Sequence, residues 1–192
     1  MVDKELSGAF GDKGTKKSSV SYGHPYAEEL IKQARELLLE SPTGQGLVKI
    51  LDGKRVPVHV LKGTSESGFS PEMMTIFIQA PGNLTRVNAL FLINIIKGLR
   101  EAAQELGGFK TPSPTKDVIA YAEFIHGRNL DSIEEVCRVV KELTNSSLFS
   151  DLLDTLAELG LNKVYKAHIR GASKEELYVE YAAAYNSSNR GD

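Results

Sequence analysis

Four polar residues recur at spacings of three, four and three within an otherwise apolar stretch: Asn94, Lys97, Glu101 and Gln104. Residues three and four apart share one face of an α-helix, so these side chains would form a single stripe. The ammonium and the carboxylate can pair with each other, and the amides can donate and accept hydrogen bonds. Such a stripe must face water, a cleft or buried polar partners.

The stripe belongs to the segment 83–107, which carries few other polar residues. Apolar positions cover most of the remaining surface: Val87, Leu90, Phe91, Ile95, Ile96, Leu99, Ala102, Ala103 and Leu106. A helix with so broad an apolar surface packs on several neighbours. We therefore predict one long helix at the centre of its domain.

The elements around this helix follow from periodicity. Apolar residues at spacings of three and four predict helices over 25–40 and 43–53, and alternation predicts strands over 56–61 and 73–79. We read residues 63–72 as a turn, and Pro81-Gly82 as the break before the central helix. After a loop over 107–117, helices are expected over 116–126, 130–143, 148–159 and 174–186.

Local signals mark some helix starts and faces. Asp131 with Glu134, and Ser173 with the acidic residues that follow it, resemble capping boxes at the starts of two helices. In the last helix Tyr178, Tyr181 and Tyr185 share one face. We interpret that face as part of the core or of an interface.

Composition divides the chain into a tail and a domain. Residues 1–21 are rich in Gly, Lys and Ser, and we expect a flexible tail there. Residues 22–192 are expected to form a single domain, with helices, a short sheet and the central helix in 22–107. The helical C-terminal half then occupies 115–187.

The bulk properties are those of an ordinary globular protein. Of 192 residues, 41% are apolar and 25% charged, and the net charge of −2 shows no bias towards nucleic acid or anionic membranes. The single cysteine, Cys137, cannot form an internal disulfide, and we read it as a buried apolar side chain. No signal peptide and no uncharged apolar run of about 18 residues is found, so we expect a cytoplasmic protein without membrane contact.

The stretch SGFSPEMMTIFIQAPGNLTRVNALFLINIIKGLREAAQE, residues 67–105, resembles small bacterial zincin-like metallopeptidases. In that family a turn, an SPE-type corner and a short strand lead into a helix with HExxH followed by Ala-x-Gln. The register places residues 97–101 on HExxH and 102–104 on Ala-x-Gln. The resemblance covers about residues 27–127.

This sequence departs from the family at each catalytic position. HExxH holds zinc with two histidines four apart, and its glutamate activates the bound water. Lys97 and Glu101 stand at the two histidine positions, and Gly98 stands at the position of the general base. The helix therefore lacks both the imidazole ligands and the base, and we expect no zinc and no other cofactor.

The resemblance also implies a third metal ligand on a following helix. Glu123 is the best match to that position, and Glu180 is a weaker one. His126 stands one turn after Glu123 and could assist a metal. We instead expect Lys97 to take the place of the lost cation and to pair with Glu123, with an exposed Lys97–Glu101 pair as the alternative.

The fold that we expect is α+β and zincin-like, with a short antiparallel sheet packed on the long central helix. Three functions follow as hypotheses. The first is a catalytically inactive metallopeptidase-like binding or regulatory module that holds a peptide or protein segment, added as a strand near 73–79. Its possible cleft is lined by Asn94, Gln104, His126 and Glu180. The second is a metallopeptidase or other hydrolase with a metal site rebuilt from Glu101, Glu123 and His126. The third is a helical interaction domain unrelated to zincins.

Overall fold

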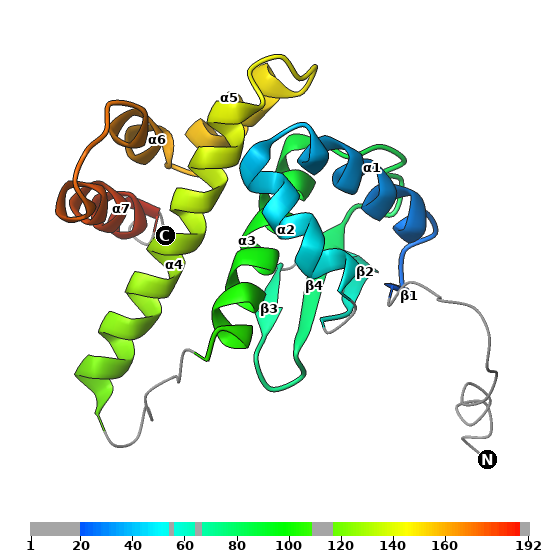
Figure 1. The fold of residues 1–192 in the computed structure, drawn as a ribbon, viewed down its shortest axis with the longest axis horizontal. Coiled ribbons are helices and arrows are strands. Elements are labelled where there is room, and N and C mark those ends of the chain that lie inside the picture. Colours follow the sequence, from blue (N-terminus) through cyan, green and yellow to red (C-terminus); the bar gives the residue numbers. More distant parts are fainter. Residues whose placement is uncertain (1–19, 54–55, 64–66, 109–116, 189–192) are drawn as a thin grey trace.

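The computed structural model describes residues 20–53, 56–63, 67–108 and 117–188 of the chain. These residues form the following strands and helices (Figure 1): β1 (Val20–Tyr22), α1 (Ala27–Leu39), α2 (Pro42–Asp52), β2 (Val58–Lys62), β3 (Gly68–Ser70), β4 (Thr75–Ala80), α3 (Ala89–Leu106), α4 (Val118–Glu142), α5 (Phe149–Glu158), α6 (Asn162–Ile169) and α7 (Lys174–Ser188). The chain is therefore α+β and mostly helical, as the sequence predicts. None of the helices in this described part is long and apolar enough to cross a membrane.

The strands form one mixed sheet in the order β1-β2-β4-β3. β1 pairs with β2, and β2 with β4, in parallel, whereas β3 pairs with β4 antiparallel. The antiparallel sheet that we expected is thus wrong for the two central strands. The reason is β3, which reverses the chain after β2, so that β4 returns in the direction of β2.

Strand β1 also changes the expected start of the domain. Residues 20 and 21 were assigned to the flexible tail, but they pair with Val58 and His59 of β2. Backbone pairing to a neighbouring strand needs no strong side-chain signal, so three residues of the composition Val-Ser-Tyr gave none. The rest of the predicted tail, residues 1–19, lies outside the described residues.

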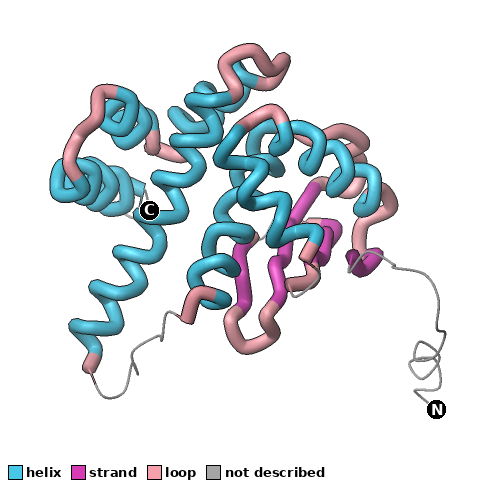
Figure 2. The backbone as a smooth tube through the Cα atoms, in the orientation of Figure 1, coloured by secondary structure: helices cyan, strands magenta, loops and turns pink. Residues whose placement is uncertain are grey.

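One face of the sheet is buried under helices. Helix α3 packs against β3 and β4, and α1 packs against β1 and β2 (Figure 2). Alternate residues of β2 and β4 are fully buried: Val58, Val60, Ile76, Ile78 and Ala80. Their neighbours are only half-buried: His59, Leu61, Phe77 and Gln79. This alternation is the signature of a sheet with one core face and one outer face.

Helix α3 is the apolar centre that the sequence predicts, although it is shorter. It begins after Asn88, whose Oδ1 accepts a hydrogen bond from the Phe91 N–H at 2.9 Å. Residues 83–88 lie outside the helix because the turn after Pro81 and this side-chain cap delay its start. Most apolar side chains of α3 are completely buried: Leu92, Ile93, Ile95, Ile96, Leu99 and Ala102.

Helix α4 is continuous where two helices were expected. It runs through Gly127 and Asp131 to Glu142 without a break. The predicted capping box at Asp131 is wrong, because this side chain binds α3 instead of capping a helix. Tertiary contacts to α3 thus outweigh the local cost of a glycine inside the helix, which is about 1 kcal/mol.

Two short elements have no counterpart in the prediction, and one capping signal is confirmed. β3 was read as part of a turn, and α6 was not assigned. The Ser173–Glu176 box is present: the Ser173 N–H donates to Glu176 Oε2 at 2.9 Å, and the Glu176 N–H donates to Ser173 Oγ at 3.3 Å. This reciprocal pair fixes the first turn of α7.

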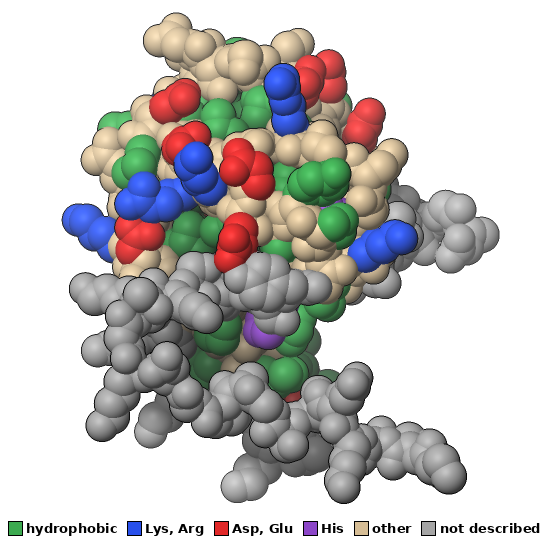
Figure 3. Space-filling model, turned by 90° about the vertical axis from the view of Figure 1, so that its right-hand side faces the viewer, with side chains coloured by type: hydrophobic (Ala, Val, Ile, Leu, Met, Phe, Trp, Pro, Cys, Tyr) green, Lys and Arg blue, Asp and Glu red, His purple; other side chains and the backbone are tan. Residues whose placement is uncertain are grey.

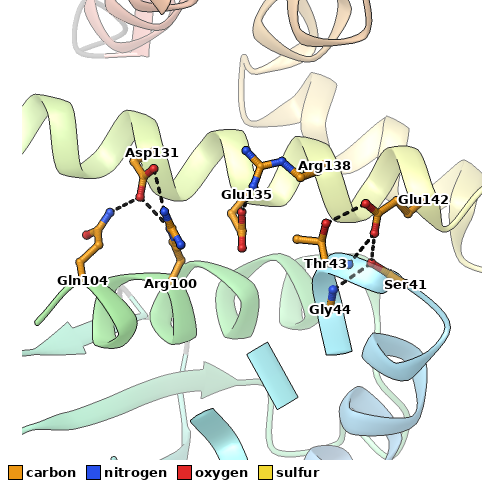
Figure 4. A network of polar contacts seen from close by, with 9 residues as sticks. All are labelled: Ser41, Thr43, Gly44, Arg100, Gln104, Asp131, Glu135, Arg138 and Glu142. Atoms are coloured by element: carbon orange, nitrogen blue, oxygen red, sulfur yellow. Dashed lines mark hydrogen bonds and ion pairs between the residues drawn. The ribbon is translucent and has the colours of Figure 1, made fainter. Parts of the chain in front are cut away.

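The end of α4 is tied to the start of α2 by one carboxylate (Figure 4). Glu142 accepts hydrogen bonds from the Thr43 N–H at 2.9 Å, from Thr43 Oγ1 at 2.7 Å and from the Ser41 hydroxyl. Ser41 also caps α2 by accepting from the Gly44 N–H at 3.0 Å. This latch joins residues about a hundred positions apart in the sequence.

Charged side chains of both signs are interspersed on the side of the molecule drawn in Figure 3. No continuous field of one sign covers the described residues that are visible there, in keeping with a net charge of −2. The polar groups that could bind a ligand lie instead where α3 meets the C-terminal helices.

Candidate functional site

Helix α3 turns its polar stripe towards the C-terminal helices. Asn94 and Lys97 line a cleft together with Tyr181 and Tyr185 of α7. One helical turn beyond Glu101, Gln104 is buried against α4, to which it donates a hydrogen bond (Figure 4). Asn94, Lys97 and Gln104 of the predicted stripe therefore meet other helices and do not form a solvated surface.

Glu101 binds the backbone of β3 at the outer edge of the sheet. Its Oε2 accepts a hydrogen bond from the backbone N–H of Phe69 at 3.3 Å. Phe69 faces Ile76 in the ladder, and because the Ile76 N–H bonds to Pro57 O on the other side, the Phe69 N–H points outward. The strand addition expected near 73–79 is wrong, since β4 is paired on both sides and the exposed edge of β3 is partly occupied by Glu101.

Gly98, at the position matched to the general base of HExxH, faces the sheet. A Cβ placed on this residue would lie 2.6 Å from Cγ2 of Ile76. Any larger side chain here would be forced into the core face of β4, away from Lys97 and the cleft. Gly98 thus serves the close packing of α3 on the sheet.

The expected Lys97–Glu123 ion pair is not formed. Lys97 lies in the cleft beside α7, whereas Glu123 lies at a different pocket, beside Arg100. The alternative pair of Lys97 with Glu101 is also not found among the ion pairs of the described residues. A different pair joins α3 to α4.

That pair is Arg100 with Asp131 (Figure 4). The guanidinium donates from Nε to Asp131 Oδ2 at 2.7 Å and from Nη2 to Oδ1 at 3.1 Å, and Gln104 Nε2 donates to the same Oδ2. Burial alone would raise the pKa of Asp131, but the hydrogen bonds from Arg100 and Gln104 outweigh burial and place this pKa below its ordinary value. The carboxylate is therefore ionised at neutral pH.

The residues considered for a rebuilt metal site do different things. Glu101 holds the sheet edge, His126 packs edge-on against the Tyr185 ring at 5.6 Å, and Glu180 is half-buried on α7. Glu123 is exposed. Across the described ranges no group of three or more His, Cys, Asp or Glu residues could hold a metal ion. The arrangement of these residues thus offers the second hypothesis no ligand set.

The other histidines have structural surroundings. His24 is fully buried; its Nδ1 accepts from the Tyr26 N–H at 3.2 Å, so Nε2 carries the proton that it donates to Pro81 O at 2.8 Å. His59 packs against the ring of Phe77 on the outer sheet face. His168 has its pKa lowered by burial and by the nearby cations of α4, which keeps it neutral at pH 7.

Of the concave regions formed by the described residues, two adjoin the polar stripe of α3 and are the candidate sites. The Lys97 cleft has a volume of about 190 Å³, and its wall includes Ile93, Asn94, Lys97, Ile133, Tyr181 and Tyr185. The Lys174 pocket has a volume of about 320 Å³, and its wall includes Arg100, Gln104, Glu123, Phe124, Asp131 and Lys174. The two regions share no lining residue.

In the Lys97 cleft a cation sits among apolar and aromatic side chains. Lys97 is half-buried, and within the described residues its ammonium has neither a hydrogen bond nor an ion pair. Burial raises the pKa of Tyr181 on the opposite wall, although a hydrogen bond to Asn129 opposes that rise. The phenol is therefore neutral, and Lys97 is the charged group of this cleft.

Reasoning from the sequence missed Arg100, Asp131 and Lys174. Arg100 was treated only as a variable position of the HExxH match, and Asp131 only as a helix cap. The shared face of the α7 tyrosines was the one available signal, and the structure buries Tyr181 there while Tyr178 and Tyr185 stay exposed. No local pattern indicated which residues of α3 and α4 would meet.

Cys137 should be inert in the folded protein. It is completely buried, and burial raises the pKa of its thiol to about 12, so almost no thiolate forms at neutral pH. We expect no reaction with Ellman's reagent in the native state and one reactive thiol per chain in denaturant. Rapid labelling of the native protein, with its circular dichroism unchanged, would contradict the buried position.

The chain was also compared with known proteins. No protein-family model matches it, and neither the curated proteins nor the solved structures include a match. The zincin resemblance therefore stays a prediction from the motif, and function has to be argued from the two concave regions themselves.

Proposed function

We propose that this protein is a non-catalytic binding module whose Lys97 cleft receives an apolar segment of a partner protein that carries a carboxylate. The proposal keeps the first of the sequence hypotheses but changes the mode of binding from strand addition to insertion into a cleft. The observation that carries it is the half-buried residue Lys97, whose ammonium has no acidic partner within the described residues.

The charge of Lys97 explains why the occupant should be an acid. A cation withdrawn from water loses hydration energy, and an opposite charge at close range restores part of it. Glu101, one turn away on α3, is engaged by the Phe69 N–H and makes no ion pair with Lys97. A carboxylate brought by a partner would therefore meet a cation that is already in place.

The walls explain why the acid should be attached to an apolar segment. Ile93 and Ile133 form an apolar floor, and Tyr181 and Tyr185 present aromatic rings with polar ends. Tyrosine is enriched at protein interfaces for this combination of contact area and hydrogen bonding. A volume of about 190 Å³ accommodates one or two side chains or a chain end, which suits a peptide better than a larger cofactor.

Selection from a peptide library tests this function. We expect the full-length protein to enrich peptides in which an acidic group adjoins an apolar residue, and Lys97→Met to weaken those peptides by at least about tenfold. Lys163→Met, which removes an exposed lysine of α6, is the matched control and should bind them unchanged.

The same titrations can reject the proposal. It fails if Lys97→Met binds the selected peptides as tightly as the parent protein does. It also fails if replacing the acidic group by its amide leaves affinity unaltered, or if no peptide is enriched above the background of a bare support.

A further inference from the structure

The Lys174 pocket differs from the Lys97 cleft in both size and chemistry. It opens between α3, α4 and the first residue of α7. Its volume of about 320 Å³ lies within the range of small-molecule sites, near the lower limit. Charged groups of both signs line it, whereas the Lys97 cleft has one cation among apolar walls.

Part of its polar lining is already satisfied and fixed in place. Arg100 and Asp131 form a two-bond ion pair, so their charges cancel within the wall. Gln104 donates to Asp131 and, at 3.4 Å, to the carbonyl of Arg128. Arg128 is itself held by Glu105 at 3.6 Å. These groups make a rigid floor and leave little free charge for a ligand.

Three polar groups at the pocket have no hydrogen-bond or ion-pair partner among the described residues. The Gln104 side chain is only 6% exposed, yet its Oε1 has no hydrogen-bond partner among the described residues. This oxygen is closed to solvent, so it adds polarity to the pocket wall without being open to an occupant. Lys174 and Glu123 are exposed at the pocket, and neither makes an ion pair within the described residues.

The balance of charges points to a ligand that carries both signs. The pocket presents three cations, Arg100, Arg128 and Lys174, and two carboxylates, Glu123 and Asp131. Glu134, which interacts electrostatically with Lys174, adds a further acid nearby. Because Arg100 and Asp131 neutralise each other, a simple anion would face Glu123 without a counter-charge, and a simple cation would face Lys174.

We infer that the Lys174 pocket binds a small zwitterion of the α-amino-acid class. The ligand's carboxylate pairs with Lys174, and its ammonium pairs with Glu123. The ligand's side chain lies against Phe124, the half-buried aromatic residue of the wall. This inference is independent of the function proposed for the Lys97 cleft.

Titration of the isotopically labelled full-length protein with a panel of free L-amino acids tests the site. We expect shifted amide signals for residues of the pocket with at least one of them. For the tightest amino acid, the N-acetyl derivative and the carboxamide should each bind at least about tenfold more weakly, because each has lost one of the two charges.

Two exposed substitutions assign the charges. Lys174→Met should weaken the amino acid about tenfold and leave its carboxamide unchanged, because the carboxamide has no carboxylate to lose. Glu123→Gln should weaken the amino acid but leave its N-acetyl derivative unchanged. Lys163→Met on α6 and Glu36→Gln on α1 are matched controls on exposed positions and should bind like the parent.

Several results would overturn the inference. It fails if no amino acid shifts the pocket signals up to about 10 mM, which corresponds to negligible affinity. It fails equally if the derivatives bind as well as the parent amino acid, or if Lys174→Met and Glu123→Gln reduce affinity for all three compounds alike.

Discussion

Replacing Gly44 by alanine should destabilise the folded protein by about 3 kcal/mol, more than most single substitutions do. Gly44 is buried in the first turn of α2, and a Cβ on it would lie 2.2 Å from the carbonyl oxygen of Leu38 at the end of α1. The obstacle is backbone, so relief requires α1 and α2 to move apart and to lose their packing. Urea unfolding followed by circular dichroism measures the change in the free energy of unfolding.

The same helix supplies a matched control. Gly46 lies two residues further along α2, is exposed, and has no atom within 4 Å of the position of an added Cβ. Gly46→Ala should therefore be neutral or should stabilise by up to about 1 kcal/mol, because alanine has the higher helix propensity. Equal stability of the two variants would mean that α1 and α2 do not approach as closely as the structure shows.

The difference between these two glycines shows which features of the fold can be predicted from the sequence and which cannot. The spacing of apolar residues correctly predicts α1, α2 and the central helix, because burial of one helical face imposes that period. Within the sequence, nothing distinguishes Gly44 from Gly46 of the same helix. Its purpose depends on Leu38 of the preceding helix, and distances between elements are not encoded in local periodicity.

The sheet shows a related limit. Alternation identifies the core positions of β2 and β4, but it is the same for a strand running in either direction. The direction of β4 is set by β3, whose three residues carry no alternating pattern of their own. The parallel pairing of β2 with β4 therefore emerges only from the complete chain path.

For the candidate site, the spacing predicts a polar stripe on α3 and fails to predict its partners. Asp131 binds Arg100 across 31 positions of sequence, while the residue that we chose by analogy to a metal ligand, Glu123, lies at another pocket than Lys97. Local signals at Asp131 favoured a helix cap, and long-range pairing with α3 prevailed. Ion pairs between helices depend on helix rotation and crossing, which a single sequence leaves open.

The second large effect concerns the latch between α4 and α2. Glu142→Gln should lower the free energy of unfolding by about 2 kcal/mol at neutral pH, because hydrogen bonds to an ionised acceptor are stronger than those to an amide. Burial alone would raise the pKa of Glu142, but the hydrogen bonds from Ser41 and Thr43 outweigh burial and bring this pKa below its ordinary value. Glu158→Gln, on an exposed position of α5, is the matched control and should change stability little.

This direction of shift fixes the pH dependence of the latch. Since the pKa of Glu142 is lower in the folded than in the unfolded state, its stabilisation is complete above about 4.5, the ordinary pKa of glutamic acid, and is lost as the pH falls through the folded value. The parent protein and Glu142→Gln should therefore differ most near neutral pH and converge in acid. Urea midpoints measured from about pH 7 down to about pH 3 test this, with Glu158→Gln subtracting the general effect of losing one charge. A difference that stays constant over this range would show that Glu142 stabilises the fold by packing and not as the ionised acceptor of Ser41 and Thr43.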